Sequence, residues 1–118
     1  MIEQYFIKIT EDKKGIVKNV TIDFPVFEIS KDGKFLVESP VLKAIGYSSI
    51  SKEEAAKDLI DDIKLFFLYH IKNNSLKETL KGLGWQTKGY NSKKFSAPVI
   101  DINKYKTAST ESISLKVA

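Results

Sequence analysis

The order of local signals across residues 27–85 constrains the fold of this chain more than any other feature. Asp32-Gly33 lies between two β-rich runs, and a tight hairpin turn favours this pair because both central residues need positive φ. Phe35–Glu38 is the expected return strand, a third short strand follows within Val41–Tyr47, and a long helix begins at Ser51. Strands followed by helices predict an α+β domain with a small, largely antiparallel sheet.

The long helix carries clear signals of its start and of its buried side. Ser51 is the expected N-cap, and Glu54 three residues later completes a capping box. Apolar and aromatic residues recur at three- and four-residue spacing, so we expect one face to pack on the sheet. That predicted face comprises Ala56, Leu59, Ile60, Ile63, Phe66, Phe67 and His70.

Two leucines of the same helix, Leu65 and Leu68, point away from this face at 100° per residue. A helix with apolar residues on its back needs a cover. The sequence leaves three candidates open: the C-terminal segment, a second copy of the chain, or a partner protein. Cover from within the chain is the default expectation, because exposed apolar patches on monomers are small.

A second, shorter helix is expected to begin at Ser75, with Glu78 in a second capping box, and to end at Gly82. The chain then passes through Trp85 into a polar, lysine-rich stretch over residues 86–96. This stretch is typical of a loop or of an exposed hairpin arm.

The two ends of the chain add further strands. Tyr5–Ile9 reads as a strand, and so does Ile16–Ile29, in which Pro25 predicts an edge strand or two strands joined at a bend. Near the C-terminus, Ala97–Ile102 resembles a short strand. Ile113–Val117 alternates cleanly and is expected to complete the sheet or to pair with a neighbouring subunit. The sequence thus predicts one domain over residues 1–118, with a core at about 16–85 and an extension over 86–118.

Composition limits the possible classes of protein. With 42% hydrophobic and 29% charged residues, the chain is typical of a globular domain. No apolar run is long enough to span a bilayer and the first residues lack a signal-peptide pattern, so we expect a cytoplasmic protein. Residues 72–118 hold nine Lys and three acids, a net charge of +6, which suits nucleic acid. The absence of arginine argues against sequence-specific reading of bases.

The sequence contains no recognisable set of catalytic residues. The chain has one histidine, His70, and no cysteine, so neither a catalytic triad nor a His/Cys metal site has enough members. Asp58, Asp61 and Asp62 fit a solvated helix face better than a magnesium site. Lys93-Lys94 near Tyr90 and Trp85 resembles a weak single-strand-binding pattern, against a solvated turn as the alternative. We therefore predict no catalytic residue, no cofactor and no metal.

The segment Phe27–His70 resembles the N-terminal domain of HicB-type antitoxins. The matching residues are the Asp32-Gly33 hairpin, Phe35-Leu36-Val37, Ser39-Pro40 with Leu42, Gly46, and the helix start Ser51-Lys52-Glu53-Glu54-Ala55. The run from Pro40 to Tyr47 is two residues longer than the family pattern and lacks its cysteine. The family's usual C-terminal DNA-binding module is not visible after Trp85.

The resemblance implies a partial ribonuclease-H-like α+β fold and a non-enzymatic role, neutralising a small HicA-like toxin that cleaves mRNA. Leu65, Leu68 and Tyr69 are the expected partner contacts, because they project off the face that packs on the sheet. Two alternatives remain open. The chain is a nucleic-acid-binding regulator that uses its basic C-terminal half, or a solitary homo-oligomeric domain without a toxin.

Overall fold

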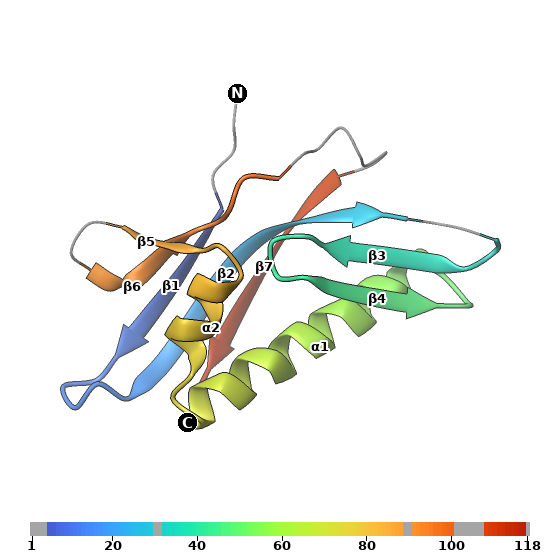
Figure 1. The fold of residues 1–118 in the computed structure, drawn as a ribbon. Helices are drawn as coiled ribbons and strands as arrows, with labels where there is room; N and C mark the ends of the chain where they lie inside the picture. Colours follow the sequence, from blue (N-terminus) through green and yellow to red (C-terminus); the bar gives the residue numbers. More distant parts are fainter. Residues whose placement is uncertain (1–4, 30–31, 89–90, 101–107, 118) are drawn as a thin grey trace.

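The computed structural model describes residues 5–29, 32–88, 91–100 and 108–117. It confirms the α+β class, with one sheet, a long helix on it, a short second helix and a C-terminal strand (Figure 1). The elements in chain order are β1 (Phe6–Glu11), β2 (Val17–Glu28), β3 (Phe35–Ser39), β4 (Ala44–Ser48), α1 (Lys52–Lys72), α2 (Leu76–Gly82), β5 (Gln86–Lys88), β6 (Asn91–Ser96) and β7 (Ala108–Lys116).

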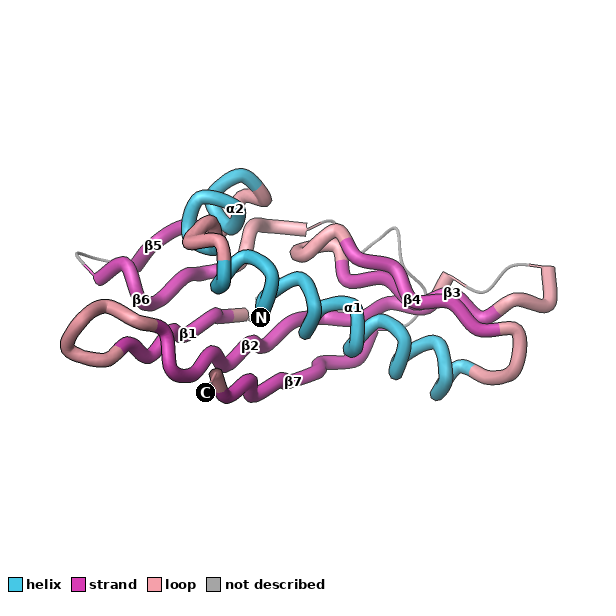
Figure 2. Tube along the Cα trace, turned by 90° about the horizontal axis from the view of Figure 1, so that it is seen from below, coloured by secondary structure: helices cyan, strands magenta, loops and turns pink. Residues whose placement is uncertain are grey.

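The sheet is organised around β2. The hydrogen-bonded order is β4-β3-β2-β1-β6-β5, and β7 pairs with the other edge of β2. Each pairing described is antiparallel. Helix α1 runs across one face of this sheet, and α2 lies beside the C-terminal end of α1 (Figure 2). Between helix and sheet lies a single core, whose largest fully buried side chains are Trp85, Phe24, Phe67 and Phe95.

The expectation for Pro25 was wrong: β2 is neither an edge strand nor two strands. It is one strand of 12 residues, paired with β1 and β3 on one edge and with β7 on the other. Ladder hydrogen bonds alternate between the two edges of a strand. The Lys18 carbonyl bonds to β7 and the Ile29 N–H bonds to the β3 side, so odd-numbered residues of β2 face the β1/β3 edge. β1 pairs with β2 only as far as Ile22, and β3 pairs with β2 only from Phe27 onward. Pro25 lies between these two paired stretches, where the ladder requires no N–H.

The hairpin turn between β2 and β3 forms where the sequence predicts it. Asp32 and Gly33 both adopt positive φ, at 54° and 74°. This is the backbone that a primed two-residue turn needs, and Asp and Gly adopt it at the lowest cost. The return strand β3 pairs with β4, which begins at Ala44, so the third strand uses only the second half of the predicted segment.

Helix α1 starts as expected, because the Ser51 hydroxyl accepts a hydrogen bond from the Glu54 N–H at 3.1 Å. Its fully buried residues are Ala55, Leu59, Ile63 and Phe67. The prediction of Ala56 as the buried alanine was wrong by one residue, since Ala56 is only half-buried. The helix packs closest to β4 and β3.

Gly46 in β4 permits this close packing. A Cβ atom at Gly46 would lie 2.2 Å from the Ala55 carbonyl oxygen and 2.7 Å from both N and Cβ of Leu59. These distances are far below van der Waals contact, and two of the three atoms belong to helix backbone. Only glycine at this position lets α1 lie directly on β4.

Helix α2 ends at Gly82 as expected, and its C-terminus is a Schellman motif. The Trp85 N–H bonds to the Leu80 carbonyl and the Gly84 N–H to the Lys81 carbonyl, with Gly84 at φ 100°. This turn delivers Trp85 into the core, where its indole Nε1–H donates to the Val41 carbonyl at 2.8 Å. The second capping box was a wrong prediction, since Ser75 makes no side-chain cap bond.

The C-terminal third contributes three strands. β5 and β6 pair with each other and join the sheet because β6 pairs with β1. The predicted strand at 97–102 was wrong for residues 97–100, which carry no strand, while 101 and 102 lie outside the described residues. The predicted terminal strand is correct but starts earlier, because β7 pairs with β2 from Ala108 onward.

Candidate protein-interaction surface

The exposed side of α1 forms one continuous line of residues. Glu54, Asp58, Asp61, Leu65 and Leu68 follow each other at spacings of three and four, which places them one above the other on a helix. All five are exposed, and we call them the outer stripe. Its N-terminal half is acidic and its C-terminal half is apolar.

The predicted partner contacts lie in the apolar half. Leu65 is 65% exposed, Leu68 41% and Tyr69, beside the stripe, 64%. The chain therefore does not cover these side chains with any of its described segments, contrary to the default expectation of intrachain cover. The C-terminal segment that was a candidate cover pairs with β2 instead.

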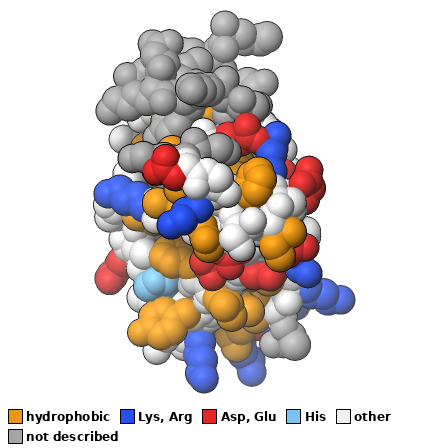
Figure 3. All heavy atoms as spheres, turned by 90° about the vertical axis from the view of Figure 1, so that its right-hand side faces the viewer, with side chains coloured by type: hydrophobic (Ala, Val, Ile, Leu, Met, Phe, Trp, Pro, Cys, Tyr) orange, Lys and Arg blue, Asp and Glu red, His pale blue; other side chains and the backbone are white. Residues whose placement is uncertain are grey.

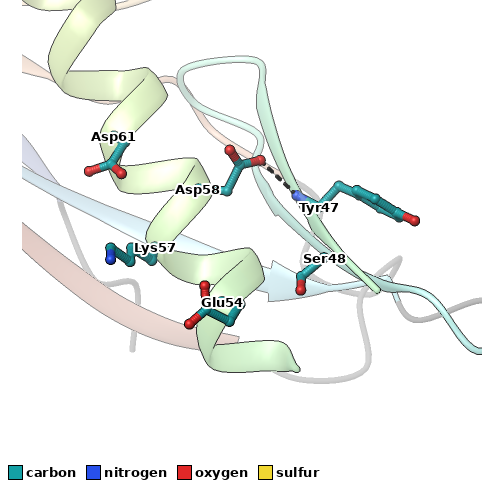
Figure 4. A pocket seen from close by; sticks show the side chains of 6 residues that line it. All are labelled: Tyr47, Ser48, Glu54, Lys57, Asp58 and Asp61. Atoms are coloured by element: carbon teal, nitrogen blue, oxygen red, sulfur yellow. Dashed lines mark hydrogen bonds between the residues drawn. The ribbon is translucent and has the colours of Figure 1, made fainter. Parts of the chain in front are cut away.

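The acidic half borders an open pocket of about 340 Å³ between α1 and β4 (Figure 4). The pocket is lined by Tyr47, Ser48, Glu54, Lys57, Asp58 and Asp61. The lining holds three carboxylates and one ammonium, so the pocket is acidic. Among the described residues, no group of three or more His, Cys, Asp or Glu is arranged to hold a metal ion.

Asp58 has a structural role at this pocket, because its Oδ2 accepts a hydrogen bond from the Tyr47 N–H at 3.0 Å. β4 is the last strand of the sheet on this side, and the odd-numbered residues of β4 direct their backbone groups outward. The carboxylate thus satisfies a backbone donor of an edge strand. The 11-residue separation of these two residues gives no local sequence signal, and sequence reasoning missed the contact.

Exposed apolar residues also occur on β4 and in the loop after it. Ile45, Tyr47 and Ile50 are among the most exposed large hydrophobic residues of the described chain. On the face shown in Figure 3, hydrophobic side chains lie above and below a central group of acidic side chains. Sequence reasoning missed these three residues as well, since the alternation of β4 does not reveal which face stays uncovered.

His70 connects the two helices beside this surface. Its Nδ1 lies 2.7 Å from the Ser75 hydroxyl and 3.2 Å from the Thr79 hydroxyl. The half-buried imidazole ring also makes edge contacts with Phe66 and Tyr69, with centroids 4.6 and 5.0 Å apart. This explains why Ser75 does not cap α2: its hydroxyl bonds to His70. The arrangement orients Tyr69 and gives His70 a structural role.

The basic and aromatic pattern near β5 and β6 does not come together as a base-stacking site. Trp85 is buried, with 1% of its surface exposed, and its indole N–H is bonded within the core. The Lys94 ammonium lies 4.5 Å from the centroid of the Phe6 ring, so this lysine packs against the sheet. Tyr90 lies outside the described residues.

Comparisons with known proteins found no match to a family model, to a curated protein or to a solved structure. The similarity to HicB-type antitoxins therefore stays a prediction from the quoted residues. Among the described residues, no helix is both long and apolar enough to cross a membrane.

Proposed function

We propose that this chain is a non-enzymatic protein-binding domain that neutralises a small, HicA-like, mRNA-cleaving toxin. The observation that carries the proposal is the outer stripe of α1, in which an acidic half is followed directly by exposed Leu65 and Leu68. Tyr69 extends the apolar half. The proposal assigns no catalytic residue to the chain.

The apolar half has the character of an interface centre. Large apolar side chains grouped on a surface favour protein contacts, and tyrosine is enriched among residues that dominate binding energy. Tyr69 is oriented by its ring contact with His70, so less side-chain entropy is lost on binding. Leu65 and Leu68 lie within one turn of it and are available without rearrangement of the core.

The acidic half supports a partner of opposite charge. A protein that binds and cleaves RNA needs a positive surface to attract phosphates. Glu54, Asp58 and Asp61 offer that surface a complementary site, which accelerates association and selects against acidic partners. An inhibitor that occupies the positive surface excludes the RNA.

The proposal is tested by purifying the tagged chain from its own cells and identifying co-purifying proteins by mass spectrometry. We expect a stoichiometric, small, RNA-cleaving protein that is lost from Leu65→Asp and Leu68→Asp variants. Truncation of a dominant contact costs about 2 kcal/mol or more, so the Kd is expected to rise about 30-fold for Tyr69→Ala. Asp61→Lys is expected to slow association, because it reverses one charge in the acidic half.

Val99→Asp is the matched control, because Val99 is also a highly exposed apolar residue but lies outside α1. It must retain the partner. Recovery of the chain alone, or equal loss of the partner from all variants, contradicts the antitoxin function. Recovery only with nucleic acid that is released by salt favours the nucleic-acid-binding regulator instead.

A further inference from the structure

The outer edge of β7 is the longest open edge of the described sheet. β7 pairs with β2 over nine consecutive residues, from Asn19 opposite Lys116 to Phe27 opposite Ala108. No other described strand pairs with it, and it lies at the border of the sheet (Figure 2).

The backbone groups of alternate β7 residues point outward. The Val117 N–H donates to the Lys18 carbonyl at 2.7 Å, so the odd-numbered residues of β7 bond to β2. The even-numbered residues Thr110, Ser112, Ser114 and Lys116 therefore direct their N–H and C=O groups outward.

The other two edges of the sheet are protected against pairing. At β4, the Asp58 carboxylate occupies the outward N–H of Tyr47. β5 has only three residues, and its register against β6 shifts between Thr87 and Lys88. Both are devices by which proteins prevent edge-to-edge association. β7 has neither: it contains no proline and no glycine, and its register with β2 is regular throughout.

We propose that the outer edge of β7 pairs with β7 of a second copy of this chain, antiparallel and about a two-fold axis at Ser114. In this register residues 111–117 of the two copies overlap. The two sheets become one continuous sheet, and the outward backbone groups of Ser112, Ser114 and Lys116 find partners. The inference is independent of the proposed toxin and predicts a dimer of the chain alone.

The apolar residues of β7 fit this register. Ile113 and the half-buried Leu115 lie on the core face of the sheet, opposite Ile22 and Val20 of β2. With the axis at Ser114, Ile113 faces Leu115 of the second copy, and Leu115 faces Ile113 of the second copy. An axis at Ile113 would instead place Leu115 opposite Glu111 of the second copy, whereas the axis at Ser114 leaves only Val117, at the end of the overlap, opposite Glu111. Cross-strand apolar pairs stabilise a sheet, and the axis at Ser114 forms two Ile113–Leu115 pairs next to its centre.

Charge selects the same register on the opposite face of the sheet. Ser112 lies opposite Asp23 in β2, and the Ser112 hydroxyl donates to the Asp23 carboxylate at 2.7 Å. With the axis at Ser114, Lys116 of the second copy lies on the other side of Ser112. Asp23 and this lysine are then two strands apart, about 10 Å between Cα atoms, which their side chains can span across the small serine. Two-fold symmetry makes this ion pair twice.

The central test is the mass of the purified full chain by sedimentation velocity, with Ser114→Pro as the variant. At about 100 μM chain, even a dimer of micromolar Kd is populated, so we expect twice the chain mass of 13.3 kDa for the wild type. The Ser114 N–H points away from β2, so proline there removes no ladder bond within the chain but blocks the two-fold pairing. Ser114→Pro is expected to be monomeric, while Ser114→Ala remains dimeric.

A charge exchange tests the register without altering the backbone. Lys116→Glu is expected to raise the dimer Kd about tenfold, and Asp23→Lys combined with Lys116→Glu is expected to restore it. Circular dichroism confirms that each variant is folded. A wild type that stays monomeric at 100 μM, or a dimer that Ser114→Pro leaves intact, overturns the proposal. A dimer lost in Ser114→Pro but insensitive to the charge exchange overturns the register, and with it the assignment of the axis to Ser114.

Discussion

Replacing Gly46 with alanine tests the contact between α1 and the sheet most directly. The added methyl group would lie 2.2 Å from the Ala55 carbonyl oxygen and 2.7 Å from Leu59 N and Cβ. Restoring ordinary contact requires a displacement of about 1 Å between α1 and β4. A gap of this size between helix and strand removes a quarter to a half of the dispersion energy of each atom pair that it separates. Since overpacking alone costs 1–3 kcal/mol, we expect a loss of about 3 kcal/mol in the free energy of unfolding.

The assay is urea unfolding followed by circular dichroism, together with thermal unfolding. For a domain of this size, 1 kcal/mol corresponds to about 4 °C, so the midpoint is expected to fall by about 12 °C. Gly82→Ala is the matched control, because no atom lies within 4 Å of its added Cβ, and it is expected to gain about 0.5 kcal/mol. In a strand without this steric conflict, Gly46→Ala would also be neutral or stabilising. Equal or higher stability of Gly46→Ala would therefore refute the close helix-to-strand contact.

Three further substitutions test single interactions. Trp85→Phe removes the donor to the buried Val41 carbonyl and is expected to cost about 2 kcal/mol, measured by urea unfolding with circular dichroism rather than tryptophan fluorescence. Ser51→Ala removes the N-cap of α1 and is expected to cost about 1 kcal/mol, whereas an unchanged midpoint would argue against the Ser51–Glu54 bond. The backbone N–H groups of Ile16 and Lys14 lower the pKa of Asp12 below its ordinary value of 3.8, because they stabilise the carboxylate. The contribution of the Asp12 carboxylate to the stability of the protein is therefore complete above pH 3.8. It is lost as the pH falls through the lower pKa of the folded state. Asp12→Asn is expected to flatten this acidic part of the stability curve, and an identical pH dependence in the variant would contradict the assignment.

Much of the fold was predictable because its signals are local. Asp32-Gly33 forms its turn from the φ preferences of two adjacent residues. Ser51 begins α1 through a bond to an N–H three residues away. The helical period alone places Leu65 and Leu68 away from the core face, but only the structure shows that no described segment covers them.

The wrong predictions concern residues whose surroundings come from distant parts of the chain. Pro25 is acceptable in a central strand because β1 and β3 leave a gap opposite it. Ser75 carries a capping pattern, but its hydroxyl bonds to His70 once the two helices are arranged. In each case the local preference is real, and a tertiary contact decides the outcome.

The sequence by itself determined the α+β class, the hairpin turn, the start of α1 and the side of α1 on which Leu65 and Leu68 lie, because interactions within about four residues specify them. Only the tertiary structure decided that β7 joins β2, that Asp58 protects the β4 edge, and that Gly46 must carry no side chain. Strand pairing and helix-on-strand contact join segments that no local period relates; the Asp23–Ser112 bond spans 89 residues of sequence. The same chain folding that buries the core thus decides which edge and which helix face remain available to a partner.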